Sequence, residues 1–470
     1  MIDQSFSDEN FRKIYDLEKR KGNDLDLSFK EFRKVKSLTN NVKRWNRVYK
    51  KYKKDLKDKK IKKIKFEERV ESLNIRKKKV IDKRELELKK VLEKISSEVA
   101  DKSFSISLIE KKNNGIKDLY IIDRESASEF FTLKQMQLNL ERAYKVKQGN
   151  RKNIISCLKQ VLSSNLKKYI IRADIRSFYE SIPNEKIINY LENDALLTYK
   201  NKILFKKLFE EYNVYSKNKK GVPRGVGVSA YLAELYMKKF DDAMMHDERI
   251  IYFARYVDDI VIVTFGSESD ADLIFEKMER IINYDLGLEI NKDKTIGPLN
   301  FGGKSSPKFD YLGYSFKRED DNLIISLSDK KIKKIKSRID LSIKNFLYTS
   351  YRNKKKASYI LLNRVKYLTG NTRLYGLKKN TLVGIYFSNN YLNDKSCLED
   401  LDKYLKNKVL YLSNKTKNLS INYGSLINDL NSLSFKEGFE EKTFRIYKSK
   451  NKHISNSSFL HEVVKVWKNA

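Results

Sequence analysis

The chain has 470 residues, and its 99 lysines and arginines outweigh 62 aspartates and glutamates to give a formal charge of +37. This excess is far more than solubility requires and favours a polyanionic partner, most simply nucleic acid. A general bias of the composition towards lysine, asparagine and isoleucine would explain part of it. Because Cys157 and Cys397 are far apart and the three histidines stand alone, disulfides, a zinc site and catalysis by His or Cys are disfavoured.

The hydropathy pattern excludes a membrane protein. There is no apolar run of about 18 residues, and the first residues, Met1 to Ser5, are polar. The sequence therefore predicts a cytoplasmic protein with neither a membrane partner nor a signal peptide. With a domain size of about 150 residues, the length predicts two to four domains.

The first 110 residues or so predict a basic, helical N-terminal region. They contain no proline and a single glycine, Gly22, and a long charged helix is expected over Val80 to Val99. The lysine-rich runs fit a surface for RNA or DNA. An ordinary solvated helix face or an assembly surface fits them equally well at this point.

The middle of the chain alternates helices with strands. Helices are expected over 131–144 and 153–162, and Lys168 to Asp174 is predicted to form a strand that ends on an acid. A helical insertion follows, to about Tyr215. The glycine-rich turn Gly221 to Ser229 then leads into a helix, whose N-terminus favours anions.

Two adjacent acids, Asp258 and Asp259, follow Tyr256 and Val257 between two apolar, β-rich segments. This pattern predicts the turn of a short hairpin. Adjacent acids inside a regular strand would diverge, whereas a tight turn can direct both towards one hard divalent cation. The alternative is a solvated turn, because aspartate is common in turns.

The elements around this hairpin predict a split βαβ arrangement. A capping box over Ser267 to Asp270 starts a helix that ends near Gly287, and Leu288 to Asn291 is the predicted last strand. In that topology the end of the first strand lies beside the hairpin, so Asp174 joins the two adjacent acids. Three converging carboxylates weaken the solvated-turn alternative.

Three aspartates on one sheet are what two-metal nucleotidyl transfer requires. Two Mg²⁺ ions, with Mn²⁺ as an alternative, about 3.5–4 Å apart lower the pKa of an attacking 3′-hydroxyl and stabilise leaving pyrophosphate. Carboxylates fix the ions, and the nucleotide phosphates complete their coordination.

Five motifs in this order resemble those of reverse transcriptases, over roughly residues 120–320. They are the first catalytic motif Ala173 to Tyr179, the nucleotide-positioning turn Gly221 to Ser229, the metal-binding box Tyr256 to Asp259, the segment Leu286 to Thr295 and the primer-grip hairpin Tyr311 to Gly313.

The resemblance implies an α+β fold built on a right-hand polymerase palm. The palm is a split βαβ, ferredoxin-like antiparallel sheet with fingers, flanked by largely α-helical N- and C-terminal regions. The implied boundaries are 1–115 for the basic helical region, 116–320 for fingers and palm, with the palm at about 165–320, and 321–470 for the helical thumb and C-terminal domain.

The same resemblance assigns roles to residues. Asp174, Asp258, Asp259 and the backbone of Ile175 would hold the metals, and Tyr179 would be the steric gate against a ribose 2′-hydroxyl, with a core aromatic as the alternative. Lys294 would donate a proton to pyrophosphate. Arg224 stands where many members carry glutamine, which puts standard template contacts in doubt. The implied nucleotide contacts are Tyr179, Phe178, Arg224, Gly225, Ser229, Arg151, Lys152 and Lys294, and the implied primer grip is Tyr311, Leu312 and Gly313.

Further segments are similar to bacterial defence-associated reverse transcriptases of the abortive-infection-like group, and most to the first reverse transcriptase of a type 3 system, which pairs two such enzymes with a noncoding RNA. They are Gln4 to Ser7, Lys13 to Asp16, Lys19 to Gly22, Gly221 to Gly225 and Gly384 to Asn389. This implies antiphage defence, deoxynucleotides as substrates, a DNA product, an RNA template or noncoding RNA as partner, and a second reverse transcriptase or a second copy of the chain as companion. No RNase H, zinc or HNH pattern follows Phe316, which disfavours a mobile group II intron enzyme.

Three hypotheses follow. The first is an RNA-directed DNA polymerase in phage defence, and the second is template-independent or protein-primed DNA synthesis, as in abortive-infection relatives. The third is a non-catalytic RNA-binding scaffold. Retention of all three acids argues against the scaffold, because buried carboxylates without a partner or metal cost stability.

Overall fold

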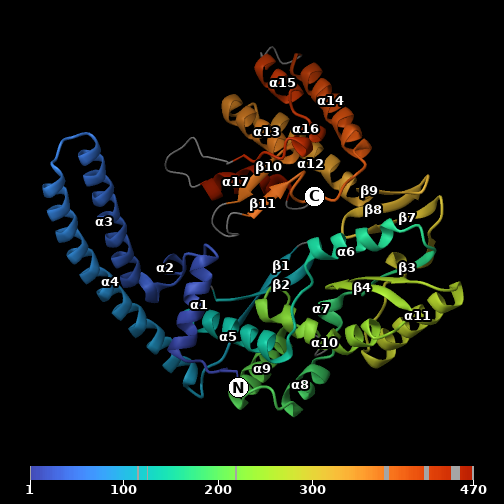
Figure 1. Cartoon of the computed structure of the whole chain (residues 1–470), viewed down its shortest axis with the longest axis horizontal. Coiled ribbons are helices and arrows are strands. Elements are labelled where there is room, and N and C mark those ends of the chain that lie inside the picture. Colours follow the sequence, from blue (N-terminus) through green and yellow to red (C-terminus); the bar gives the residue numbers. More distant parts are fainter. Residues whose placement is uncertain are drawn as a thin grey trace. The chain divides into compact units, whose positions relative to one another are not determined.

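Helices form most of both ends of the chain, and strands are concentrated in its middle (Figure 1). The computed structural model describes residues 2–113, 116–123, 125–216, 220–374, 381–417, 423–445 and 456–467. They belong to two compact units: unit 1 comprises Met1–Gln148, Arg176–Lys239 and Leu286–Glu289, and unit 2 comprises Gly149–Ile175, Phe240–Asp285 and Ile290–Ala470. The boundary predicted at residue 115 falls outside the described residues, and the three predicted regions stay a prediction.

Unit 1 is mainly helical, as the sequence predicts for its first part. Phe11, Phe32 and Phe131 pack ring against ring in a buried core between the N-terminal helices and α5. The two-stranded ribbon β1–β2 was not predicted. The elements are α1 (Asp8–Arg20), α2 (Leu25–Ser28), η1 (Lys30–Phe32), α3 (Arg33–Lys57), α4 (Lys63–Ala100), β1 (Leu108–Asn113), β2 (Ile116–Ile122), α5 (Ala127–Tyr144), α7 (Phe178–Ser181), α8 (Asn184–Asn193), α9 (Tyr199–Tyr215) and the first part of α10 (Gly227–Met245).

The palm sheet lies in unit 2. Its strands are β3 (Lys168–Asp174), β4 (Ile250–Tyr256), β5 (Asp259–Thr264) and β6 (Ile296–Phe301), all antiparallel, in the order β4-β5-β3-β6. This is the order of a split βαβ sheet, so the predicted α+β palm is confirmed. Helix α11 (Glu268–Arg280) begins with the predicted capping box and continues into the π-turn η2 (Ile281–Asp285).

The last strand of the palm was placed wrongly by the sequence. Leu288 to Asn291 makes only an isolated bridge between Ile290 and Ile175, and the strand itself is β6. The 3-10 turn η3 (Lys292–Lys294) interrupts the antiparallel run that both segments make along β3. The prediction stopped at the first apolar alternation and missed its continuation beyond this turn.

The rest of unit 2 shares one hydrophobic core with the palm. It contains helix α6, a three-stranded sheet β7–β9 and the mostly helical C-terminal part. The third strand β9 and the ribbon β10–β11 were not predicted. The elements are α6 (Arg151–Ser163), β7 (Ser306–Tyr311), β8 (Tyr314–Glu319), β9 (Asn322–Leu327), α12 (Asp329–Thr349), α13 (Lys354–Thr369), β10 (Asn371–Leu374), β11 (Thr381–Gly384), α14 (Ser396–Lys417), α15 (Gly424–Asn431), α16 (Phe435–Glu440), α17 (Asn456–Val464) and η4 (Lys465–Trp467).

Two buried cations bind the C-terminal end of α6. Lys168 Nζ donates to the carbonyls of Val161 and Ser164, at 2.8 Å each, and Arg318 Nη1 donates to those of Leu162 and Ser164, at 2.9 and 3.1 Å. The last carbonyls of a helix lack intrahelical partners and carry the negative end of its dipole. Both strands that carry these cations are therefore fixed to α6.

Within the described ranges, every helix is too short or too polar to span a lipid bilayer.

We expect Arg318→Leu to lower the free energy of unfolding by about 3 kcal/mol or more, because it leaves several buried carbonyls without donors. Urea unfolding followed by circular dichroism measures this change. The matched control is Lys317→Leu on the neighbouring, half-exposed position, which should change stability by less than about 0.5 kcal/mol. Equal effects of the two substitutions would contradict the role of Arg318.

Candidate active site

The pairing of β3 with β5 brings two of the three predicted acids together. In the register, Asp174 lies directly opposite Asp259. Directly opposed residues of an antiparallel pair point to the same face, with Cβ atoms about 4.5–5.5 Å apart. The backbone N–H of Ile175 donates to the carbonyl of Asp258 at 3.1 Å, which holds the third acid at the same strand end. The three acids therefore lie next to one another, as the predicted topology requires.

The turn that carries Asp258 is held in a strained conformation. Val257 has φ 63°, a left-handed value that glycine usually takes in two-residue hairpin turns and that a β-branched residue rarely adopts. Arg255 Nη1 donates to the Val257 carbonyl at 2.9 Å, and the same guanidinium bonds both carboxylate oxygens of Asp241, at 2.8 and 2.6 Å. This buried ion pair fixes the turn from one side.

Neighbouring cations and amides bind two of the three carboxylates. Asp174 Oδ2 accepts from Lys294 Nζ at 2.9 Å and from Asn291 Nδ2 at 3.1 Å. Asp259 Oδ1 accepts from Arg172 Nη2 at 3.2 Å. The sequence had singled out Lys294 but neither Asn291 nor Arg172. Each of the two lies in or next to a predicted motif, and this position was the signal that could have identified it.

The third carboxylate, Asp258, lies in surroundings that disfavour its negative charge. Burial is the largest cause that raises the pKa of Asp258, and the nearby charges of Asp259 and Asp174 raise it further. A hydrogen bond from its own backbone N–H and the charge of Lys294 oppose this rise. Repulsion between all three groups shows that they share one electrostatic site. An additional cation at this site would relieve that repulsion.

The donor set fits a hard divalent cation, because it consists of carboxylate oxygens. In the part of the chain that the structure describes, no three Asp, Glu, His or Cys side chains are gathered closely enough to bind one ion. The carboxylate of Asp174 is turned to Lys294, and that of Asp259 to Arg172. To bind an ion, the carboxylates of Asp174 and Asp259 must therefore turn away from Lys294 and Arg172. The backbone already holds the acids next to one another.

The predicted primer-grip turn joins β7 and β8 in unit 2. Leu312 and Gly313 both have positive φ, 45° and 81°, as in a type I′ turn. The buried Tyr311 donates through its hydroxyl to the carbonyl of Asp259 at 3.2 Å. This bond ties the turn to the strand that carries two of the acids.

Arg151 lies at this turn. Its Nε and Nη2 donate to the Leu312 carbonyl at 3.1 and 2.7 Å, and its Nη1 donates to the Ser388 carbonyl at 3.1 Å. The guanidinium also lies over the ring of Tyr314, 5.1 Å from its centroid. Lys152, the next residue, is exposed.

Sequence reasoning missed a second cation at the turn, Lys331. Its Nζ lies 5.7 Å from the centroid of Tyr314, so that ring has a cation contact from Lys331 as well as from Arg151, and Lys331 donates to Asn389 Oδ1. Burial, followed by the charge of Arg151, lowers the pKa of Lys331 to about 8. Among the described residues neither cation has a carboxylate at ion-pair distance, so this cluster can attract an anion.

The remaining predicted nucleotide contacts lie in unit 1, where Arg224 contacts Tyr179. Its guanidinium makes two hydrogen bonds to Glu180, at 2.8 and 3.3 Å, and lies over the ring of Tyr179, 5.1 Å from the centroid. Phe178 is buried and packs against Tyr179 at 5.6 Å. The Tyr179 ring is thus partly exposed and fixed on two sides.

The glycine-rich turn is bound closely to its surroundings in unit 1. Gly225 has φ 101°, and a Cβ there would lie 2.7 Å from the carbonyl of Tyr120. The Tyr120 N–H donates to the Arg224 carbonyl at 2.7 Å. Ser229 is buried, and its hydroxyl donates to the Pro223 carbonyl at 2.8 Å, so its side chain stabilises the turn itself.

Comparison with known proteins identifies a family. The model of the reverse transcriptase (RNA-dependent DNA polymerase) family matches residues 75–316. The putative COX1/OXI3 intron 2 protein of Saccharomyces cerevisiae is 22% identical in an alignment of 298 residues that covers 48% of this chain and 34% of that protein. The chain thus spans about a third of the length of this curated relative.

Two solved telomerase structures are also similar. The telomerase of Candida albicans, in complex with a fragment of telomeric RNA, is 15% identical with a TM-score of 0.33, over 78% of this chain and 64% of that one. The apo telomerase of Candida tropicalis is 13% identical with a TM-score of 0.35, over 77% and 65%. These TM-scores are too low for the likeness to bear on function.

We expect Asp258→Asn to raise the free energy of unfolding at pH 7 in metal-free buffer. Because the folded-state pKa of Asp258 lies above its ordinary value of 3.8, the ionised group costs stability as the pH rises through that pKa. The gain should therefore disappear at pH values below the ordinary pKa. Urea unfolding at both pH values measures it, and the exposed Asp272→Asn on α11 is the control. A loss of stability at pH 7 would contradict the electrostatic account.

Proposed function

Because the chain belongs to the reverse transcriptase (RNA-dependent DNA polymerase) family, we propose that it is an RNA-directed DNA polymerase with Asp174, Asp258 and Asp259 as its metal ligands. The observation that supports this most is the convergence of three mutually repelling carboxylates at one end of the β3–β5 ladder. When bound, Mg²⁺ or Mn²⁺ neutralises triphosphate charge and activates the primer 3′-hydroxyl.

The neighbours of the acids have supporting roles in this proposal. Asn291 donates to Asp174 through its side chain and also through its backbone N–H, to the Asp174 carbonyl at 2.7 Å, so it sets the orientation of that residue. Lys294 is half-exposed and lies 2.9 Å from Asp174. A half-exposed cation beside the catalytic acids is suited to hold the leaving pyrophosphate and to give it a proton.

Substrate selection is assigned to Tyr179. An aromatic ring blocks a ribose 2′-hydroxyl only if the ring cannot move aside. The stacked guanidinium of Arg224, itself held by Glu180, gives the ring that rigidity. The same ion pair offers a reason for arginine at a position where many family members carry glutamine: here the residue supports the gate.

The primer terminus is assigned to the turn Tyr311 to Gly313. Tyr311 bonds the backbone of Asp259, and Arg151 bonds the backbone of Leu312. The turn is thus connected through hydrogen bonds to a catalytic strand. Arg151 and Lys331 supply positive charge next to it, which suits the phosphates of a primer strand.

A role in antiphage defence, with a noncoding RNA and a companion reverse transcriptase, is the finer proposal. It rests on the sequence similarity of the N-terminal segments, of Gly221 to Gly225 and of Gly384 to Asn389. Ser388 and Asn389 in the last of these segments accept hydrogen bonds from Arg151 and Lys331. Gln4 in the first N-terminal segment is buried and bonds Asn201. Residues of both segments thus make hydrogen bonds that stabilise the fold.

We expect Asp174→Asn and Asp258→Asn each to reduce deoxynucleotide incorporation on a primed RNA by about 10³-fold or more, because metal ligation contributes several kcal/mol to such reactions. Asp272→Asn should leave incorporation unchanged. Mg²⁺ should raise the melting temperature of the wild type but not of Asp258→Asn. Synthesis that survives both ligand substitutions would refute the metal assignment, and sequencing of the product would separate copying of the template from untemplated synthesis.

We expect Tyr179→Ala to increase the use of ribonucleotides relative to deoxynucleotides by roughly 10- to 100-fold, since one steric contact in a pocket contributes about 1–3 kcal/mol to discrimination. Tyr179→Phe keeps the ring and should keep the discrimination. The measurement is the ratio of kcat/KM for the two substrates. If both variants discriminate equally well, Tyr179 is a core aromatic and not the gate.

A further inference from the structure

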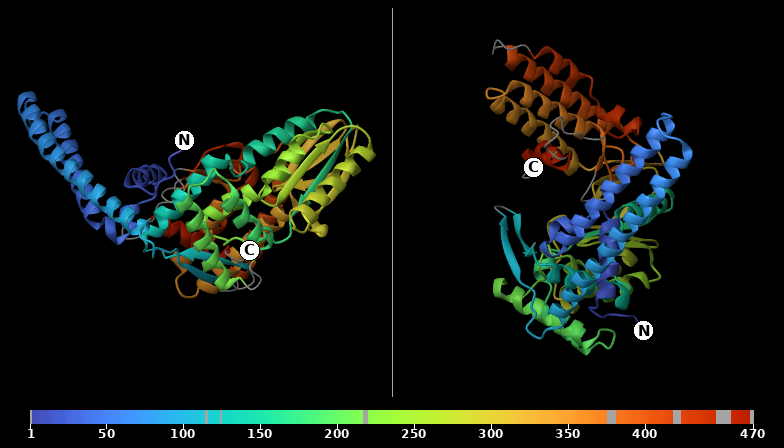
Figure 2. Two further views of the ribbon diagram at one scale, coloured as in Figure 1. Left: turned by 90° about the horizontal axis from the view of Figure 1, so that it is seen from below. Right: turned by 90° about the vertical axis from the view of Figure 1, so that its left-hand side faces the viewer.

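Helices α3 and α4 form a long antiparallel hairpin in unit 1, of 25 and 38 residues, and lie side by side in both views of Figure 2. The apolar residues of α3 recur at alternating spacings of three and four, which is the pattern of a coiled-coil seam. From α4, Leu73 is buried, and Arg69 lies over the ring of Tyr52 at 5.6 Å. The seam residues of α3 are Val35, Leu38, Val42, Trp45, Tyr49, Tyr52 and Leu56.

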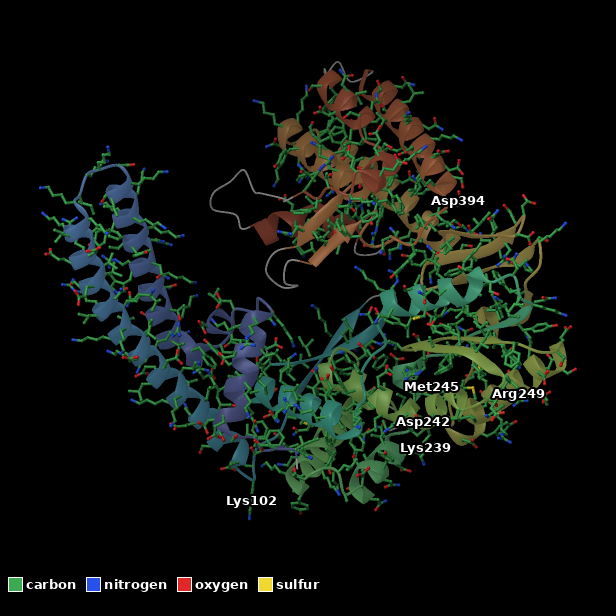
Figure 3. The ribbon with its side chains drawn as sticks, in the orientation of Figure 1. Lys102, Lys239, Asp242, Met245, Arg249 and Asp394 are labelled. Carbon is green, nitrogen blue, oxygen red and sulfur yellow. The ribbon has the colours of Figure 1, made fainter. Side chains whose placement is uncertain are left out.

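The face of α3 opposite this seam is basic. Its cations recur with the same alternation of four and three, so they form one row, here called the basic stripe, about 21 Å long at 1.5 Å per residue. All of them are exposed, and Figure 3 shows side chains projecting outward along both helices of the hairpin. The basic stripe consists of Lys43, Arg47, Lys50, Lys54 and Lys57.

These charges lack internal compensation. Residues 33–79 contain 21 basic and five acidic residues, and the only ion pair there among the described residues joins Lys63 and Glu67 at 3.9 Å. Like charges at helical spacing repel one another and destabilise the helix. The arrangement is therefore costly for folding, which indicates selection for something other than stability.

The inner half of α4 shows that lysine-rich composition does not explain this. Residues 80–100 contain five basic and five acidic residues. Ion pairs there include Lys89–Glu93 at 3.7 Å and Lys94–Glu98 at 3.8 Å. A general lysine bias would act on both halves of one helix alike. The charge excess is instead confined to the outer part of the hairpin.

The chemistry of the stripe identifies its partner. Lysine is a point charge that suits phosphate oxygens, whereas interfaces with proteins are depleted in lysine and need an apolar or aromatic centre. Most apolar residues of α3 face α4. The exposed large apolar side chains of residues 33–79, Tyr49, Ile64 and Ile75, are too few to form a face that enters a membrane. We propose that the basic stripe binds the phosphodiester backbone of a structured RNA, as a contact additional to the aspartate site. The choice of RNA over DNA rests on the proposed polymerase function.

The test is RNA binding by the full chain without nucleotides, measured by fluorescence anisotropy with a labelled stem-loop over a range of salt concentrations. The stripe variant should lower affinity about tenfold or more and reduce the slope of log affinity against log salt by about 3, as expected for four lost phosphate contacts. The control variant removes the same charge from the inner half of α4 and should change affinity by less than about twofold. The stripe variant carries Lys43→Gln, Arg47→Gln, Lys50→Gln and Lys54→Gln; the control carries Lys83→Gln, Lys89→Gln, Lys90→Gln and Lys94→Gln.

The outcomes separate the alternatives, provided that circular dichroism shows equal helicity in both variants. Equal losses in the two variants, or no loss in the stripe variant, would overturn the proposal. Displacement of the RNA by polyglutamate at equal charge would overturn it in favour of an acidic protein, and equally tight binding of the same sequence as duplex DNA would overturn the choice of RNA. A wild type that binds RNA through the stripe but makes no DNA refutes the polymerase function and leaves the stripe intact.

Discussion

The antiparallel pairing of β3 with β5 is the constraint on which the candidate site depends. Both strands are buried, with Ile170 and Val263 opposite each other in the core, and this fixes the register that sets Asp174 opposite Asp259. A slip by one residue would turn the side chain of Asp174 to the other face of the sheet. The same core residues that stabilise the palm therefore also position the acids, so folding and the geometry of the site cannot be separated.

The register has an electrostatic cost. Burial and two neighbouring carboxylates raise the pKa of Asp258 against the effect of its own backbone hydrogen bond. Lys294 and Arg172 make ion pairs with the other two acids. Strain adds to this cost, because Val257 adopts a left-handed conformation. Sites with perturbed pKa values and strained backbone are more often functional than structural. Here both features occur in one turn, and their coincidence supports the proposed functional role of this turn.

The sequence was sufficient to predict that the three acids lie together, but not to predict the contacts around them. Asp174, Asp258 and Asp259 could be placed together because strand, turn and split βαβ patterns are local and periodic. The partner of Arg151 could not be predicted, because a hydrogen bond to the backbone carbonyl of Leu312 leaves no pattern in the sequence. Lys331 is one of several lysines at the start of α12, so its sequence context does not distinguish it. The last palm strand was misplaced since a short 3-10 turn divides one antiparallel run into two segments.

Helix α6 links these features, since basic side chains bind backbone carbonyls at both of its ends. At its N-terminal end Arg151 bonds the turn of β7–β8, and at its C-terminal end Lys168 and Arg318 bond the helix carbonyls from β3 and β8. Carbonyls do not titrate, so the geometry of the turn should stay constant over the pH range in which the aspartates change charge. In unit 2 the position of the turn is thus independent of the ionisation of the acids. A change of pH within that range should act on the charge of the site and leave its framework in place.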